Sequence, residues 1–455
     1  MFAPLPLASR IWSRTDFPCP AMPPADLLKD FFNALPESAQ GGADVSRVYV
    51  NRSPDDEHDP VANLKQYIQW EPRTGGCYLF SGLRGAGKTT ELNRLVTELR
   101  EDGIAAYYCD ASTYLNLNDP QLSLAELLMT ALAGLADAVR QELGQDKLND
   151  SIWQRTKRLF QSKVELKPKL IAPLGDTGAS LEVEATLQEN PDFRKELISF
   201  AQSSSAFFDE AAKFADEVAA TIRRHTQCEK IVLVVDSLER ISAPSGDEAK
   251  LFNSLKEVFF NEPTRLQFAS LFVVYSAPPY LHAVLPGVSN GFSQSVALPN
   301  FKVIQRDGSR NEDGICRMRE IVDRRFPKWR EILDETVMNH LAWMSGGNVR
   351  RFFNLLRTLA RKAALSRVAL PITAVDAPSV IHALAEAAQP LQWLTGPDRE
   401  WLKRFMDNGD NPSGHIKDLA ADLPPIIRLF DHSLVLDYQN GSPWYQVPPL
   451  VRPYV

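Results

Sequence analysis

One short segment constrains this chain more than any other, because residues 82–89 match the pattern G-x-x-x-x-G-K-[ST]. The apolar run 77–80 before the segment predicts a buried parallel strand. After it, Leu92, Leu95 and Leu99 recur at helical spacing. In such a strand–turn–helix unit, backbone N–H groups and the helix N-terminus bind phosphate. We therefore predict an α/β fold built on a parallel P-loop sheet.

The loop supplies most of the candidate ligand contacts. The predicted nucleotide-binding residues are Gly82, Leu83, Arg84, Gly85, Ala86, Gly87, Lys88, Thr89 and Thr90. Lys88 is expected to reach the β- and γ-phosphates and Thr89 to ligate Mg²⁺. The guanine-reading tetrapeptide [NT]-K-x-D does not occur in the sequence, so ATP is the predicted nucleotide. We expect Lys88 to contact the ligand and to lie outside the packed core, so that its replacement disturbs binding more than folding.

Two further apolar strands end in polar residues that suit the same site. The run 231–236 ends at Asp236, a candidate second Mg²⁺ ligand, and Glu239 follows three residues later. Glu239 is the candidate base that orients an attacking water, with a solvated loop acid as the alternative. The run 271–276 ends at Ser276, which either lies beside the γ-phosphate or simply ends a strand.

Composition limits the class of protein. A chain of 455 residues with 44% hydrophobic content has room for roughly three globular domains. Its five cysteines show no C-x-x-C or metal-ligand spacing, and the first thirty residues contain no uninterrupted apolar segment. These features predict a soluble, cytoplasmic protein without a membrane association. The formal net charge of −7 argues against a general electrostatic attraction to nucleic acid, although local basic patches remain compatible with it.

The pattern of helices, strands and turns predicts four regions. They are an N-terminal extension (1–45) that packs loosely, a P-loop core (46–305) with a large insertion (113–228), a helical lid (306–374) and a winged-helix-like domain (375–455). Asp59 and Pro60 predict the start of a helix that runs to Trp70. In P-loop ATPases the segment before the first core strand commonly borders the adenine, so a resemblance to them makes Tyr49 and Val50 candidates for that contact.

The insertion is predicted to be mostly helical, with a small β element. Ser123 and Glu126 form a capping box for a helix to about 143, segments 164–167 and 181–184 alternate like strands, and 191–224 returns to helix. Two interpretations stay open, namely packing against the core and a surface for a partner or signal.

The last eighty residues predict helices at 398–406, 414–421 and 425–431, then a hairpin around Asn440–Gly441. Three helices and a hairpin indicate a winged helix. Ten acids face six bases from Asp376 onward, and the expected recognition helix offers little beyond Arg428 and His432. Docking to protein or to the nucleotide domain is therefore favoured over reading DNA.

Five features together resemble the AAA+/STAND superfamily of P-loop ATPases. They are residues 82–89, Asp236, Ser276, the Gly346–Gly347 pair with Arg350, and the terminal winged helix. The resemblance is greatest to the branch shared by origin-recognition-type ATPases and STAND signalling switches, and it covers about half the chain, without the insertion. It implies an Mg²⁺-dependent ATPase in which Ser276 takes the sensor 1 position and Arg350 meets the γ-phosphate as sensor 2. The alternative for Arg350 is a solvated basic stripe shared with Asn354, Arg357 and Arg361.

In STAND-like proteins ATP binding toggles a signalling state, and many bacterial members serve antiviral defence or stress systems. The resemblance thus implies a switch that signals to a separate protein effector and can form a nucleotide-dependent homo-oligomer. The chain departs from AAA+ rings in two ways: no second acid follows Asp236 directly, and no arginine finger lies between 277 and 301. Arg265, Arg306 and Arg310 are substitutes by proximity only, which favours a slow switch. The alternatives are a DNA-binding ATPase of the origin-recognition or transposition-regulator type, and a small-molecule P-loop kinase.

Overall fold

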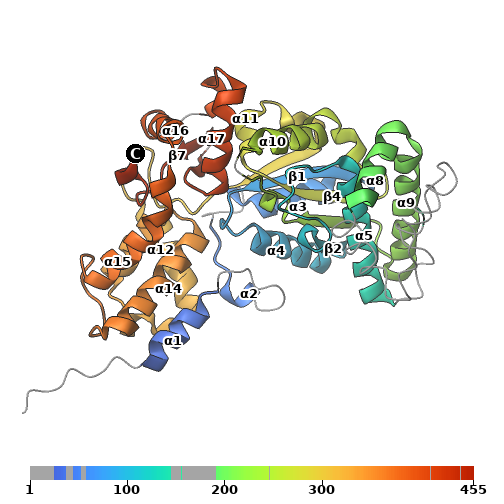
Figure 1. Cartoon of the computed structure of the whole chain (residues 1–455). Coiled ribbons are helices and arrows are strands. Elements are labelled where there is room, and N and C mark those ends of the chain that lie inside the picture. Colours follow the sequence, from blue (N-terminus) through green and yellow to red (C-terminus); the bar gives the residue numbers. More distant parts are fainter. Residues whose placement is uncertain are drawn as a thin grey trace, which may run out of the picture.

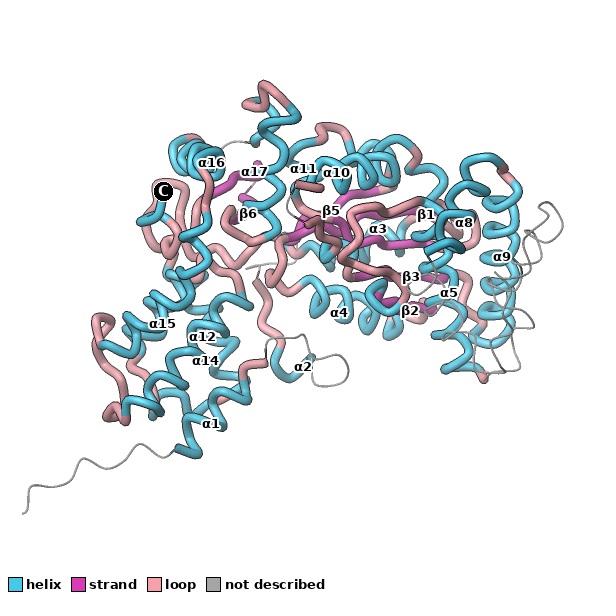
Figure 2. Tube along the Cα trace, in the orientation of Figure 1, coloured by secondary structure: helices cyan, strands magenta, loops and turns pink. Residues whose placement is uncertain are grey.

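A parallel five-stranded sheet forms the centre of the protein (Figures 1 and 2). The computed structural model describes residues 25–36, 45–52, 58–144, 155, 191–244, 246–409, 411–440 and 442–455. The strands are β1 (Gly76–Gly82), β2 (Ala105–Asp110), β3 (Ile231–Asp236), β4 (Phe272–Ala277) and β5 (Gln294–Leu298). The three inner strands are buried throughout, which explains their continuous apolar runs. The predicted α/β fold with a parallel P-loop sheet is confirmed.

The strand order β2-β3-β4-β1-β5 decides which strand ends meet. β4 lies between β1 and β3, with Ser81 opposite Ala277. On the far side of β3, Asp236 is in register with Asp110 of β2. The carboxyl ends of β1, β4 and β3 therefore share one edge of the sheet, where parallel α/β sheets bind ligands.

Helices cover both faces of this sheet. Figure 1 shows α4 (Lys88–Glu101) on one side and α10 (Glu248–Lys256) with α11 (Tyr280–Val284) on the other. The predicted helix before the sheet is α3 (Pro60–Trp70), and the Asp59 side chain caps it by accepting a hydrogen bond from the Val61 N–H at 2.9 Å.

The region 113–228 adds a helical layer beside β2. It contains α5 (Leu124–Leu143), with the predicted capping box, α8 (Pro191–Ser203) and α9 (Ala206–Thr226). The expected return to helix over 191–224 is confirmed, in the form of the two helices α8 and α9. α5 lies so close to β2 that a Cβ at Gly134 would stand 2.2 Å from the Cys109 Sγ. This contact supports the core-packing interpretation of α5, while the strand-like segments 164–167 and 181–184 lie outside the described residues.

The helices of the predicted lid share a second hydrophobic core. It joins α12 (Glu312–Arg325), α13 (Glu335–Met344), α14 (Val349–Ser366) and α15 (Pro378–Ala388) to α1 (Ala25–Ala34), whereas α2 (Val45–Val48) lies against α4 and α12. Leu28, Phe31 and Leu35 are fully buried in this core. The expectation that 1–45 packs loosely is therefore wrong for α1, because its apolar face completes the lid.

The C-terminal region contains α16 (Gly396–Asp407), α17 (Leu419–Asp431) and an antiparallel hairpin of β6 (Leu436–Asn440) and β7 (Ser442–Gln446). The hairpin is confirmed, but the separate helices 414–421 and 425–431 are wrong. α17 starts at the Asp418 cap and continues through Pro424 and Pro425. Burial of its apolar side offsets the hydrogen bonds that the prolines cannot donate. Among the described residues, no helix is long and apolar enough to cross a membrane.

Candidate nucleotide-binding site

The loop between β1 and α4 has the backbone of a phosphate cradle. Gly85 and Gly87 have φ of +81° and +100°, values that only glycine adopts readily, and Gly87 is the N-cap of α4. A Cβ at Gly85 would lie 2.6 Å from the Arg350 Cβ, so this glycine also permits close approach of the lid. Leu83 and Ala86 are buried, and Thr90 is half-buried in the first turn of α4. The fold and the loop together define an α/β protein with a P-loop.

Lys88 lies inside the loop and not on its surface. Its side chain is 2% exposed, and its Nζ donates hydrogen bonds to the carbonyls of Gly82 (2.7 Å) and Leu83 (3.0 Å). Glu239 Oε1 is 3.2 Å from the same Nζ. Burial lowers the pKa of Lys88, while the charges of Glu239 and Asp236 oppose that shift. The expectation that Lys88 lies outside the core is therefore wrong: its ammonium group balances two buried carboxylates.

The surroundings of Asp236 fit a cation site. Its Oδ2 accepts hydrogen bonds from Thr89 Oγ1 at 2.7 Å and from the Tyr108 hydroxyl at 2.8 Å, whereas its buried Oδ1 has no hydrogen-bond partner among the described residues. Burial, and then the charge of Glu239, raise the pKa of Asp236. An orphaned carboxylate oxygen beside a threonine hydroxyl fits Mg²⁺, which prefers few protein oxygens and completes its shell with phosphates and water. No group of three or more His, Cys, Asp or Glu that could hold a metal occurs in the described part of the chain.

Glu239 is a buried residue of the site. It belongs to the short 3₁₀ turn Leu238–Arg240 directly after β3, and it is 6% exposed. Its buried Oε2 has no hydrogen-bond partner in the part of the chain that the structure describes. The alternative of a solvated loop acid is therefore wrong. A carboxylate with one oxygen on Lys88 and one oxygen unused has the chemistry of a water-orienting base, and that role stays a prediction.

Ser276 lies between the P-loop and Asp236, as the strand order requires. Its Oγ accepts a hydrogen bond from the Leu238 N–H at 2.9 Å, and the side chain is fully buried. Ser276 thus holds the turn that carries Glu239. A contact between Ser276 and the γ-phosphate remains a prediction.

The lid and the C-terminal region both contact the loop at Arg84 and Gly85. The backbone N–H of Arg350 donates to the Gly85 carbonyl at 3.2 Å, and Asn348 Nδ2 donates to the Arg84 carbonyl at 2.8 Å. Ser433 Oγ donates to the same Arg84 carbonyl at 3.0 Å. The charge of Arg350 also lowers the pKa of Lys88, which places its guanidinium within electrostatic reach of the site.

The Arg84 side chain connects the loop to the remaining parts of the site. Its Nε donates to the Glu239 carbonyl at 3.1 Å, and its Nη2 donates to the Ile241 carbonyl at 3.2 Å. The Asp431 carboxylate is 3.8 Å from Nη2. One loop residue therefore touches the turn after β3, the lid and the C-terminal region.

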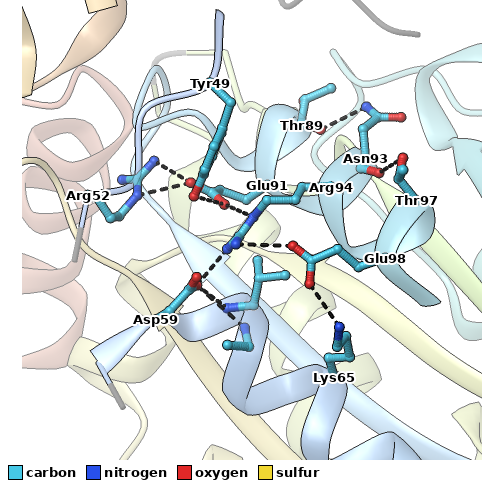
Figure 3. A network of polar contacts seen from close by, with 12 residues as sticks. Tyr49, Arg52, Asp59, Lys65, Thr89, Glu91, Asn93, Arg94, Thr97 and Glu98 are labelled. Carbon is cyan, nitrogen blue, oxygen red and sulfur yellow. Dashed lines mark hydrogen bonds and ion pairs between the residues drawn. The ribbon is translucent and has the colours of Figure 1, made fainter. Parts of the chain in front are cut away.

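Sequence reasoning missed a network of hydrogen bonds and ion pairs that contacts the P-loop (Figure 3). Arg52 donates hydrogen bonds to the carbonyls of Ala86 (2.9 Å) and Pro299 (2.6 Å), and its Nη2 lies 3.1 Å from Glu91 Oε1. Arg94 pairs with Glu91 and with Asp59, and the Tyr49 hydroxyl also donates to Glu91 at 3.3 Å. Arg52 and Glu91 are far apart in sequence, so no local pattern could join them. Tyr108 and Ser433 were missed for the same reason.

Comparison with known proteins does not assign a family. No protein-family model and no curated protein matches the chain. Among solved structures, the chain is similar to the Drosophila ORC bound to DNA (14% identity, 98% of this chain and 96% of that chain covered, TM-score 0.38). It is also similar to the Aeropyrum pernix ORC2 protein (12%, 89% and 94%, 0.38) and to the Thermotoga maritima RuvB Holliday junction branch migration motor (10%, 87% and 92%, 0.33). Similarities at this level establish neither an activity nor a ligand for this chain.

Proposed function

We propose that this protein binds Mg·ATP at the P-loop, hydrolyses it slowly, and acts as a molecular switch that signals to a separate protein effector. The convergence of Lys88, Thr89, Asp236 and Glu239 at one sheet edge carries the proposal. In it, Gly82–Thr90 hold the phosphates, Thr89 and Asp236 hold Mg²⁺, and Glu239 orients water. Bound Mg²⁺ would neutralise charge that develops on the transferred phosphoryl group.

The contacts of Arg84 supply a route from the nucleotide to the rest of the molecule. Its carbonyl accepts from Asn348 of the lid and Ser433 of the C-terminal region, so a change in loop conformation alters both contacts. A role in bacterial antiviral defence or stress belongs to the same proposal and is supported by the sequence resemblance alone. Nucleotide-dependent self-association is part of it as well.

A DNA-binding ATPase of the origin-recognition type is the alternative. In that alternative, α17 would be the recognition helix of a winged helix. Its one basic side chain, Arg428, pairs instead with Glu248 (3.2 Å) and Asp398 (2.8 Å), while α17 packs against α10 and α11. This arrangement supports docking of α17 within the protein over duplex reading.

Replacement of Ser433 tests the switch. Ser433→Ala removes one donor to the Arg84 carbonyl, so ATP turnover or ATP affinity should change severalfold, measured by phosphate release and by calorimetry. Ser366→Ala, at an exposed serine that ends α14, is the matched control. Unchanged turnover and affinity in Ser433→Ala would contradict the coupling.

A further inference from the structure

A large groove separates the lid from the C-terminal region. Its volume is about 1070 Å³, and it begins at the P-loop, where Arg84, Asn348 and Arg350 line it. One wall is the polar side of α14, and the other is formed by residues 390–398 and 428–434. The polar stripe of α14 faces this groove and is therefore not a plain solvated face. It consists of Arg350, Asn354, Arg357 and Arg361.

More positive than negative side chains line the groove, whereas the chain as a whole has a negative net charge. Six arginines line it: Arg84, Arg350, Arg351, Arg357, Arg361 and Arg428. Among the residues that the structure describes, three carboxylates line it: Glu386, Asp398 and Asp431. The chain as a whole has a formal net charge of −7, so this excess of cations is local and selects anions.

Two of these guanidinium groups contact backbone carbonyls or an aromatic ring. Arg351 donates to the carbonyls of Ser345 (3.3 Å) and Ser433 (2.7 Å), and burial lowers its pKa to about 10. Arg357 stacks at 4.0 Å on the Phe32 ring. With 1.5 Å rise per residue, the stripe from Arg350 to Arg361 spans roughly 17 Å, far more than one phosphate group needs.

An aromatic side chain lies on the wall of the groove opposite α14. Trp393 ends the short turn Gln389–Trp393, and 84% of its surface is exposed. Pro390, Leu391 and Leu394 extend the apolar surface next to it. An exposed indole beside an arginine stripe is the combination that binds single strands, where bases stack on aromatic rings and phosphates pair with arginines.

We propose that this groove binds single-stranded nucleic acid, with phosphates on the α14 arginines and a base on Trp393. A duplex keeps its base faces inside the helix and cannot offer one to the indole. An acidic peptide would satisfy the arginines but gives Trp393 no planar partner. The proposal goes beyond the ATP switch and does not depend on it, because the groove residues tested below lie outside the P-loop.

Binding of fluorescein-labelled dT12 and rU12 to the full-length protein at low salt tests the site. Trp393→Ala should weaken binding about tenfold. Arg361→Ala should weaken it and reduce the slope of log affinity against log salt by about 0.7. Glu386→Gln should strengthen binding severalfold, because Glu386 pairs with Arg361 and with Lys362. A gain of affinity cannot arise from misfolding.

Two substitutions at the end of α3 provide matched controls. Trp70 is also an exposed tryptophan, at 76%, and Arg73 is also an exposed, ion-paired arginine. Trp70→Ala and Arg73→Ala should leave binding unchanged. The proposal is overturned if neither strand binds, if the three groove variants bind like wild type, or if duplex DNA, poly-glutamate or free nucleotide displaces the strand at equal concentration.

Discussion

The buried charges of Lys88, Asp236 and Glu239 form one unit at the residue scale. A single ammonium group faces two carboxylates, and each carboxylate keeps one oxygen for which the described residues offer no hydrogen-bond partner. Burying such oxygens costs free energy that a ligand or cation can return on binding. Buried polar groups usually have hydrogen-bond partners, so the two unpartnered oxygens favour the prediction of a functional site.

Glu239→Gln separates binding from catalysis. The amide keeps the size of the side chain and a contact with Lys88 but loses the basic oxygen, so turnover should fall about 100-fold or more. ATP affinity should remain close to that of wild type. Phosphate release under saturating ATP measures the effect, with Glu335→Gln on the lid surface as control. Wild-type turnover in Glu239→Gln would remove this residue from the mechanism.

Asp437 makes stability depend on pH. The residue is buried on β6, its Oδ1 has no hydrogen-bond partner among the residues that the structure describes, and burial raises its pKa to about 7. Between about pH 4 and pH 7 the native protein holds a proton that the unfolded chain has released, so the free energy of unfolding decreases as pH rises. Between pH 5 and pH 8 the free energy of unfolding should fall further in wild type than in Asp437→Asn, by on the order of 2 kcal/mol.

Urea unfolding at pH 5 and pH 8 measures this difference. The exposed Asp376 provides the control, and Asp376→Asn should show the same loss as wild type. An equal loss in Asp437→Asn and wild type would show that Asp437 is ionised in the native protein across this range.

At the scale of elements, the glycine pair before α14 joins the lid to the core. Gly347 has a φ of +77°, and a Cβ there would lie 1.8 Å from the Phe301 carbonyl oxygen. Gly347→Ala should therefore lower the free energy of unfolding by about 1–3 kcal/mol, measured by urea denaturation. Gly396→Ala is the matched control, because Gly396 begins α16 with nothing within 4 Å of the added Cβ. Equal stability of the two variants would contradict the tight junction.

Local sequence signals predicted most of the elements and the residues that meet at the sheet edge, but not the strand order or the contacts between distant side chains. The Asp59 cap, the Ser123–Glu126 capping box and the P-loop are patterns within a few residues, and each was found. The position of β4 between β1 and β3 depends on contacts between distant segments, as does the Arg52–Glu91 pair. The two helices expected at 414–421 and 425–431 are one helix through Pro424 and Pro425, because burial of its apolar side favours a continuous helix, which a local pattern does not report.

At the scale of the whole molecule, the predicted domain boundaries do not separate the hydrophobic cores. Phe405 and Phe430 belong to the same buried cluster as the sheet, while Leu436, Tyr438 and Trp444 belong to the cluster of the lid. Removing residues 375–455 would expose apolar surface in both clusters. Single substitutions such as Ser433→Ala are therefore the appropriate test of communication between the C-terminal region and the loop.

The central claim is that the P-loop binds Mg·ATP, and titration calorimetry of the full-length protein tests it most directly. Wild type and Lys250→Ala, an exposed lysine on α10, should bind with equal affinity. Lys88→Ala should show no binding, and thermal unfolding should verify that it is folded, since the variant leaves Asp236 and Glu239 without their cation. Wild-type ATP affinity in folded Lys88→Ala would contradict the account.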